Sequence, residues 1–215
     1  GISARVPMVP QGAAWILPVL SLPHIFYAWL WFYPDAWVAI TRSLLGTKAK
    51  GMKRTAVGGA ACSHMATAAH VIKVIQTAGM LAWYYTYAPS VLSLSALQAQ
   101  PLAQLGLGIG LVLCGQIFNV GIYTAIGQNG VYYGNKFGAP LGPWCTGFPF
   151  NVPGPIGRHP QYFGVLLTIA GLTVLAWCPE MVEAGGVVVS LTWCSYYVVT
   201  SIIEQTENTE RKIED

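Results

Sequence analysis

The chain carries few charged residues. Its 215 residues include 11 Lys and Arg and 8 Asp and Glu, or 9% in all, whereas soluble globular domains carry about 25%. Hydrophobic residues make up 54% of the chain and aromatic residues 12%, while disordered chains are rich in charge and poor in aromatic residues. The net charge of +3 is too small to favour a nucleic acid as partner. Soluble, disordered and nucleic-acid-binding proteins are therefore not expected.

The cysteine pattern excludes two further classes. The five Cys are odd in number, scattered, and mostly inside apolar runs, where Cys behaves as a small hydrophobic residue. They do not form the dense, even framework of a disulfide-stapled small protein. No C-x-x-C pair occurs, so we expect no structural zinc or other metal site. The class that remains is an integral membrane protein.

Five apolar stretches match, or nearly match, the length of about 20 residues that a membrane-spanning helix requires. They run near 13–32, 66–87, 102–126, 162–178 and 185–203. The fourth is short and only residues 179–184 separate it from the fifth, so we expect a helical hairpin that need not cross the full bilayer. The sequence thus predicts an all-α integral membrane protein, a single domain of residues 1–215 with about five membrane helices.

The basic residues support this count. Nine of the eleven fall in three segments that five spans place on one side of the membrane, as the positive-inside rule requires; they are Arg42, Lys48, Lys50, Lys53, Arg54, Lys136, Arg158, Arg211 and Lys212. Arg5 lies on the opposite side and Lys73 within the second span. Trp and Tyr residues, Trp31 among them, gather where spans meet water, which is typical of an aromatic belt.

Glycines recur in the third span. Gly106, Gly108 and Gly110 form G-L-G-I-G, and small residues four apart allow two helices to pack closely. The absent side chains would equally let a ribose or adenine approach the backbone. The spacing alone favours packing over binding.

A loop rich in Pro and Gly, from Gly147 to Gly164, leads directly into the fourth span. Arg158 and His159 stand where that helix begins, beside the positive end of its dipole, which suits a carboxylate or a phosphate. The alternative is an interfacial anchor that binds lipid headgroups. The spacing favours neither.

Ionisable residues mark two further places. Glu204 and Glu207 follow the last span one helical turn apart, and because the helix dipole disfavours an anion there, a cationic partner such as a ligand or Arg158 is expected. A solvated acidic tail is the alternative. His70 and Lys73 share one face of the second span, and intramembrane ionisable residues are candidates for function, although Lys73 could also extend to the basic interface.

Several motifs together resemble the phospholipid methyltransferases. They are F-P-F-N (148–151), H-P-Q-Y-F-G (159–164) and E-Q-T-E-N (204–208) in the C-terminal half, with G-L-G in the third span and Y-G-N-K-F-G (133–138) after it. The first two spans resemble those of the plant and algal members, so the resemblance covers nearly the whole chain. The same C-terminal architecture occurs in isoprenylcysteine carboxyl methyltransferases and sterol reductases.

The resemblance implies an enzyme that uses S-adenosylmethionine to N-methylate phosphatidylethanolamine-type lipid headgroups toward phosphatidylcholine. Gly106 and Gly108 would line the cofactor, Arg158, His159 and Tyr162 would meet its carboxylate or ribose, and Glu204 would hold its amino group. Glu204 and Glu207 would be the catalytic carboxylates, accepting the proton that the headgroup ammonium must lose; His70 is a less favoured acceptor.

The alternative is a protein of another class, a catalytically inactive structural subunit of a larger membrane complex, because a fold does not fix a function. The resemblance implies phospholipid substrate and membrane lipids as partners, with other subunits in the second case. It also implies a multi-pass protein of the endoplasmic reticulum or of a mitochondrial or other organellar membrane.

Overall fold

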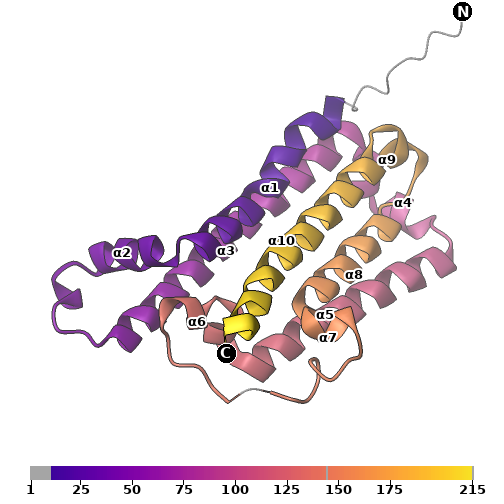
Figure 1. Cartoon of the computed structure of the whole chain (residues 1–215). Helices are drawn as coiled ribbons and strands as arrows, with labels where there is room; N and C mark the ends of the chain where they lie inside the picture. The colour runs from indigo at the N-terminus through magenta and orange to yellow at the C-terminus, as the bar shows by residue number, and fades with distance from the viewer. Residues whose placement is uncertain (1–10, 144, 215) are drawn as a thin grey trace, which may run out of the picture.

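The computed structural model is a bundle of helices (Figure 1). It describes residues 11–143 and 145–214, with the side chains of Gln11, Pro155 and 205–214 excepted, and no strand occurs among them. The long helices are α1 (Gln11–Phe32), α2 (Pro34–Leu45), α3 (Arg54–Tyr87), α5 (Leu102–Val131), α8 (Pro160–Leu175) and α10 (Gly186–Glu214). The short ones are η1 (Gly46–Ala49), η2 (Pro89–Leu92), α4 (Leu94–Gln98), α6 (Gly134–Phe137), α7 (Pro155–Arg158) and α9 (Pro179–Glu183). The all-α prediction is confirmed.

Four of these helices are long and apolar enough to cross a membrane, and they cover Gly12–Phe32, Arg54–Tyr87, Leu102–Phe137 and Gly186–Glu204. The remaining expected span, α8, is apolar but has only 16 residues, and it packs against α10 across α9 as the hairpin prediction requires. Helix α3 begins at Arg54, before the expected boundary of the span at residue 66. Its first three turns contain Gly, Ser, Thr and His among the apolar residues and so form no continuous apolar run.

Two prolines lie inside α1, which nevertheless continues through Pro18 and Pro23. Proline removes a backbone donor and so leaves a carbonyl without its usual partner, and in a membrane a neighbouring helix must supply one. Gln76 of α3 donates its Nε2 to the Leu20 carbonyl at 2.9 Å, and both residues are buried. Pro23 leaves the Val19 carbonyl without its helical donor, and the bond to the neighbouring Leu20 carbonyl ties α1 to α3 beside this proline.

Glycines bring α5 and α8 into backbone contact. A Cβ added at Gly115 would lie 2.4 Å from the Gly164 carbonyl oxygen, and one added at Gly171 would lie 2.7 Å from the Gly108 carbonyl oxygen. Such short approaches are possible only without side chains. The recurrent glycines of the third span thus include packing residues, and Gly108 is one of them.

This contact predicts the effect of adding one methyl group. Gly115→Ala forces the two helices apart and is expected to destabilise the protein by about 1–3 kcal/mol, the range for overpacking. Gly110→Ala is the matched control, because a Cβ there meets no atom within 4 Å and Ala favours a helix. Thermal unfolding in detergent should show a lower Tm for Gly115→Ala only; equal Tm values would contradict the close contact.

Candidate functional site

Glu204 lies where α10 meets α8 and the α5–α6 turn, and the end of α10 is beside α6 and α7 in Figure 1. The Tyr133 hydroxyl donates to Glu204 Oε1 at 2.5 Å. The Tyr162 hydroxyl donates to the same oxygen. Among the described residues, no group donates a hydrogen bond to Glu204 Oε2. Glu204 and Arg158 do not form an ion pair with each other there. Two neutral phenols therefore hold the carboxylate, and its second oxygen is left for another donor.

The position of Tyr133 comes from a kink inside α5, near its C-terminal end. Gly127 interrupts the helix with φ 65° and ψ 179°, and Tyr133 itself adopts the left-handed conformation, with φ 55°, that non-glycine residues rarely adopt. The following turn packs on α3, where a Cβ at Gly58 would lie 2.6 Å from the Phe137 carbonyl oxygen. The turn is thus fixed against α3 and directs the Tyr133 side chain toward α10.

A cavity of about 220 Å³ lies beside this carboxylate. Its wall combines the end of α5, the start of α8 and the end of α10 with Trp31 of α1. The lining residues are Trp31, Ile122, Ile126, Gly130, Val131, Tyr133, Asn135, Phe150, Arg158, His159, Pro160, Gln161, Tyr162 and Glu204. The cavity therefore joins one anionic and one cationic side chain with aromatic walls.

His159 is the N-cap residue of α8, and its ring stacks on that of Tyr162 with the centroids 5.8 Å apart. Burial, and secondarily the neighbouring Arg158 guanidinium, lower the pKa of His159 below its usual value of 6.5. The imidazole is therefore neutral at pH 7 and can donate one hydrogen bond and accept another. Arg158 carries the positive charge at this end of the cavity.

Trp31 closes the cavity from α1. Its Nε1 is buried and has no hydrogen-bond partner among the described residues, although buried donors are nearly always paired. Tyr133 packs edge-on against its ring at 5.4 Å, and Lys136 Nζ lies 3.9 Å from the ring centroid. Lys136 is also close enough to act electrostatically on Glu204. An unpaired donor in the wall is what a cavity shaped for a polar ligand would present.

A second, smaller cavity of about 30 Å³ adjoins the first. The two share Val131, Tyr133, Gln161 and Tyr162 as lining residues. The smaller one is otherwise lined by Tyr27, Met65, Lys73, Tyr132, Val165 and Tyr197. Tyrosine faces attract ammonium groups by about 0.5–2 kcal/mol each. The lining of this chamber therefore suits a methylated amine in its chemistry, while its volume is about that of one water molecule.

The structure brings together four of the residues predicted from the sequence, Arg158, His159, Tyr162 and Glu204, around one cavity. It does not bring Gly106 and Gly108 to it. Gly108 contacts Leu175 at the far end of α8, and a Cβ at Gly106 meets nothing within 4 Å.

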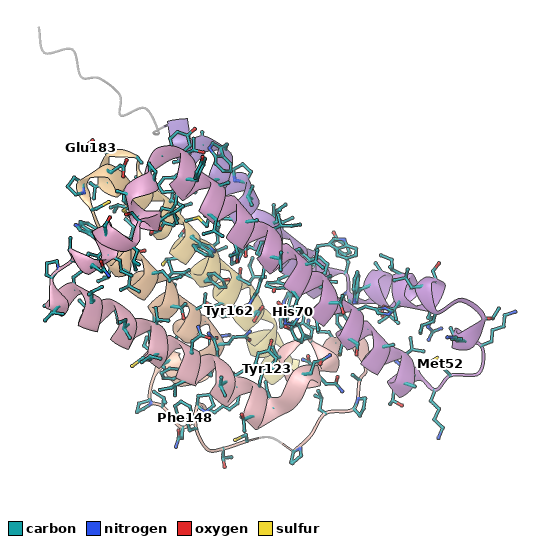
Figure 2. All side chains as sticks on the ribbon, turned by 180° about the vertical axis from the view of Figure 1, so that it is seen from behind. Met52, His70, Tyr123, Phe148, Tyr162 and Glu183 are labelled. Carbon is teal, nitrogen blue, oxygen red and sulfur yellow. The ribbon has the colours of Figure 1, made fainter. Side chains whose placement is uncertain are left out.

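The other three candidates are Glu207, His70 and Lys73. The side chain of Glu207 lies outside the described residues. His70 is engaged within its own helix, where Nδ1 lies 2.6 Å from the Ala66 carbonyl oxygen. Lys73 lines the smaller cavity. Figure 2 shows Tyr162 and His70 in the middle part of the bundle and Glu183 at one end.

Sequence reasoning did not assign Tyr133, Gly130 and Trp31 to the site. Tyr133 belongs to Y-G-N-K-F-G, which carried the resemblance but received no role, and Trp31 fitted the belt pattern. The signal that points to the first two is G-Q-N-G, residues 127–130, where two glycines close together interrupt a long apolar helix. A break of this kind within a membrane is tolerated only where protein or a cavity surrounds it.

The chain is similar to known proteins over most of its length. Residues 103–210 match the family model described as Phospholipid methyltransferase. A phosphatidyl-N-methylethanolamine N-methyltransferase of Arabidopsis thaliana is 30% identical over 190 residues, which cover 87% of this chain and 88% of the relative. A protein of the same name from Saccharomyces cerevisiae is 32% identical over 111 residues, 48% of this chain and 50% of the relative. No solved structure matches the chain significantly.

Proposed function

Since the chain belongs to the phospholipid methyltransferase family, we propose that it methylates the headgroup nitrogen of phosphatidylethanolamine-type lipids, toward phosphatidylcholine, with S-adenosylmethionine as donor. The observation that carries the proposal is the Glu204 carboxylate, which two phenols hold beside a cavity at the end of a membrane bundle. Such an anion, with one oxygen left for a further donor, is suited to a cationic ligand group.

The residues of the larger cavity fit the donor. Arg158 and His159 would bind its carboxylate and a ribose hydroxyl, and Glu204 its amino group. The unpaired Trp31 Nε1 would accommodate its polar edge, and Gly130 lines the same cavity. When bound, S-adenosylmethionine supplies an electrophilic methyl group. Gly130 thus replaces Gly106 and Gly108 as the glycine that we assign to donor binding.

Tyr133 and Tyr162 would conduct the proton that the substrate ammonium must lose before it attacks. Both line the smaller, tyrosine-lined chamber as well as the larger cavity, and each donates to Glu204. A phenol oxygen can accept a proton while its own passes to the carboxylate. The rest of the catalysis is the positioning of the lipid nitrogen against the methyl carbon. Positioning of this kind can lower the activation free energy by about 7–11 kcal/mol. Glu204 would be the final acceptor, and Glu207 stays a second candidate.

The alternative of an inactive structural subunit is not favoured, because the named relatives are enzymes and because Glu204 accepts hydrogen bonds from two phenols beside a cavity. The chain is a membrane protein by its apolar helices. Both relatives are eukaryotic, which supports the endoplasmic reticulum or a mitochondrial or other organellar membrane as its place.

The direct test uses the purified chain in mixed micelles with methyl-labelled S-adenosylmethionine and phosphatidyl-N-methylethanolamine. We expect label in the lipid and saturable donor binding by calorimetry. Phosphatidylcholine, whose nitrogen cannot accept a methyl group, is the matched lipid control and should stay unlabelled. A folded protein that neither binds the donor nor labels the lipid would contradict the proposal and favour the structural subunit.

A further inference from the structure

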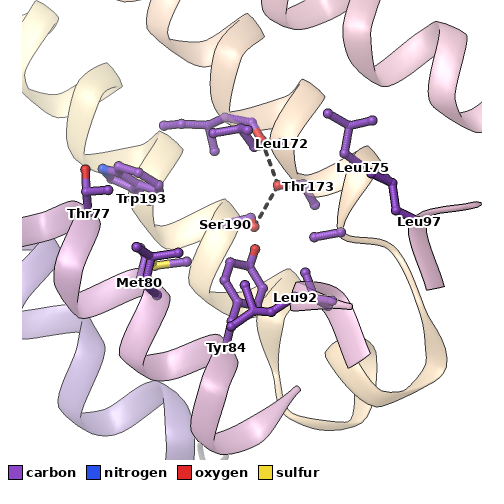
Figure 3. A pocket seen from close by; sticks show the side chains of 14 residues that line it. Thr77, Met80, Tyr84, Leu92, Leu97, Leu172, Thr173, Leu175, Ser190 and Trp193 are labelled. Carbon is purple, nitrogen blue, oxygen red and sulfur yellow. Dashed lines mark hydrogen bonds between the residues drawn. The ribbon is translucent and has the colours of Figure 1, made fainter. Parts of the chain in front are cut away.

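A third cavity, called the apolar cavity below, lies away from Glu204, and Figure 3 shows the side chains that line it. It has a volume of about 350 Å³ and lies between α3, α8 and α10, with η2 and α4 at its side. The lining is mainly aliphatic and is formed by Thr77, Met80, Leu81, Tyr84, Val91, Leu92, Leu97, Ile169, Leu172, Thr173, Leu175, Ala176, Ser190 and Trp193. The hydroxyls of Thr173 and Ser190 bond to each other at 2.8 Å. The cavity therefore presents an apolar interior to an occupant.

The same three helices line this apolar cavity and the tyrosine-lined chamber. On each helix the lining residues recur at the three- and four-residue spacing of one face. On α3 they are Lys73, Thr77, Met80 and Tyr84; on α8 they are Tyr162, Val165, Ile169 and Leu172; on α10 they are Tyr197, Trp193 and Ser190. These faces of α3, α8 and α10 together form a surface that we call the seam. It runs from Tyr162, which donates to Glu204, to the apolar cavity.

Lys73 is the charged residue of this seam. It lines the tyrosine-lined chamber, and its side chain is also exposed on the outside of α3, in a helix apolar enough to span a membrane. Among the described residues, no acidic side chain pairs with it. A charge within a span is costly and is usually compensated by a partner or a function. The partner that fits is an anion that enters from the bilayer.

A donor without a partner lies further along the seam. Trp193 Nε1 is buried and has no partner among the described residues. Figure 3 shows Trp193 beside Thr77, which is one helical turn from Lys73. The seam therefore offers, in order, aromatic faces, a cation, an unpaired donor and an aliphatic cavity. A glycerophospholipid has an ammonium, a phosphate, ester carbonyls and acyl chains in that order.

We propose that the seam between α3, α8 and α10 holds the phospholipid substrate: Lys73 binds its phosphate, Trp193 an ester carbonyl, and the apolar cavity one acyl chain. The inference rests on the proposed function, since it places the lipid nitrogen beside Tyr133 and Tyr162. Lys73 is a positioning residue, because it binds the headgroup without touching the reacting atoms. A short ethanolamine linker joins the phosphate to the nitrogen of the lipid. The proposal therefore requires the tyrosine-lined chamber to adjoin the cavity beside Glu204, and the two share lining residues.

The first experiment measures lipid kinetics of Lys73→Met in mixed micelles. Loss of a charge-assisted hydrogen bond should raise the KM for phosphatidyl-N-methylethanolamine about 10- to 100-fold, with kcat and the Kd for S-adenosylmethionine nearly unchanged. Lys73→Arg should restore most of the affinity. Lys53→Met, in the basic loop, controls for attraction to anionic surfaces. Equal KM values for Lys73→Met and wild type, or an equal rise in Lys53→Met, would overturn the role of Lys73.

The second experiment is independent of activity. A phosphatidyl-N-methylethanolamine with a diazirine in one acyl chain should cross-link to the α3 segment 80–84 and the α8 segment 172–175. Met80→Trp, which fills the cavity, and Lys73→Met should each reduce the yield in protein that keeps its wild-type Tm. Cross-linking elsewhere, or equal labelling by a diazirine fatty acid without phosphate, would overturn the inference. Specific cross-linking by a protein that does not methylate lipid would support the seam while contradicting the proposed enzyme.

Discussion

Glu204→Gln is expected to lower the rate of lipid methylation by roughly 100- to 10,000-fold, the range that a proton acceptor contributes. The substitution keeps the size of the side chain and an oxygen that can accept from Tyr133 and Tyr162. It removes the negative charge that a cationic ligand group requires. Binding of S-adenosylmethionine should weaken with it, because Glu204 is assigned to the donor's amino group.

The stability of the same variant separates a site from a structural anchor. No ion pair between Glu204 and Arg158 occurs among the described residues. Lys136, which acts electrostatically on Glu204, is only half-buried and keeps its contact with the Trp31 ring, so Tm should change little. Glu180→Gln is the control: Glu180 also accepts from a neighbour, the Ser90 amide at 3.0 Å, but it lies in α9. It should retain methylation. A Glu204→Gln protein with normal turnover and a lowered Tm would assign Glu204 to structure alone.

Most of the fold follows from composition. Lipid-facing helices need uninterrupted apolar residues, so the five expected segments correspond to α1, α3, α5, α8 and α10. The predicted last span, 185–203, agrees with the apolar part of α10, Gly186–Glu204. The helices α3 and α10 themselves extend further, to Arg54 and to Glu214, through residues that form no continuous apolar run. Beside Pro23, the bond from Gln76 to the Leu20 carbonyl ties α3 to α1, and such a contact between residues far apart in sequence leaves no local pattern.

The candidate site was predictable where its residues are adjacent in sequence. Arg158, His159 and Tyr162 lie within one turn at the start of α8, so their proximity follows from local structure. Tyr133 reaches Glu204 only because the chain breaks at Gly127 and turns through a left-handed residue, and helical periodicity does not report such a turn. Gly106 and Gly108 lie outside the lining of the candidate cavity for the converse reason: a glycine pattern does not tell which end of a helix of about 45 Å borders a cavity.

His159→Ala is expected to weaken S-adenosylmethionine binding by about 1–3 kcal/mol, or about 5- to 150-fold in Kd, the cost of one buried or charge-assisted hydrogen bond. The ring lines the cavity and stacks on Tyr162. Its lowered pKa means that the neutral imidazole makes the contact at pH 7. Asn, which is also neutral and carries both a donor and an acceptor, should recover part of the loss in His159→Asn.

Calorimetric titration of the three proteins at pH 7 measures this directly. His64→Ala is the matched control, since His64 is partly buried on α3 and lies 3.4 Å from Thr41 Oγ1, away from the lining of the cavity. Its Kd should equal that of wild type. Because we assign the donor and the lipid to different cavities, the KM of His159→Ala for the lipid should stay within about twofold of wild type at saturating donor, less than the change of tenfold in affinity that 1.4 kcal/mol produces. An unchanged Kd in His159→Ala would show that the Arg158–His159 junction binds lipid headgroups instead of the methyl donor.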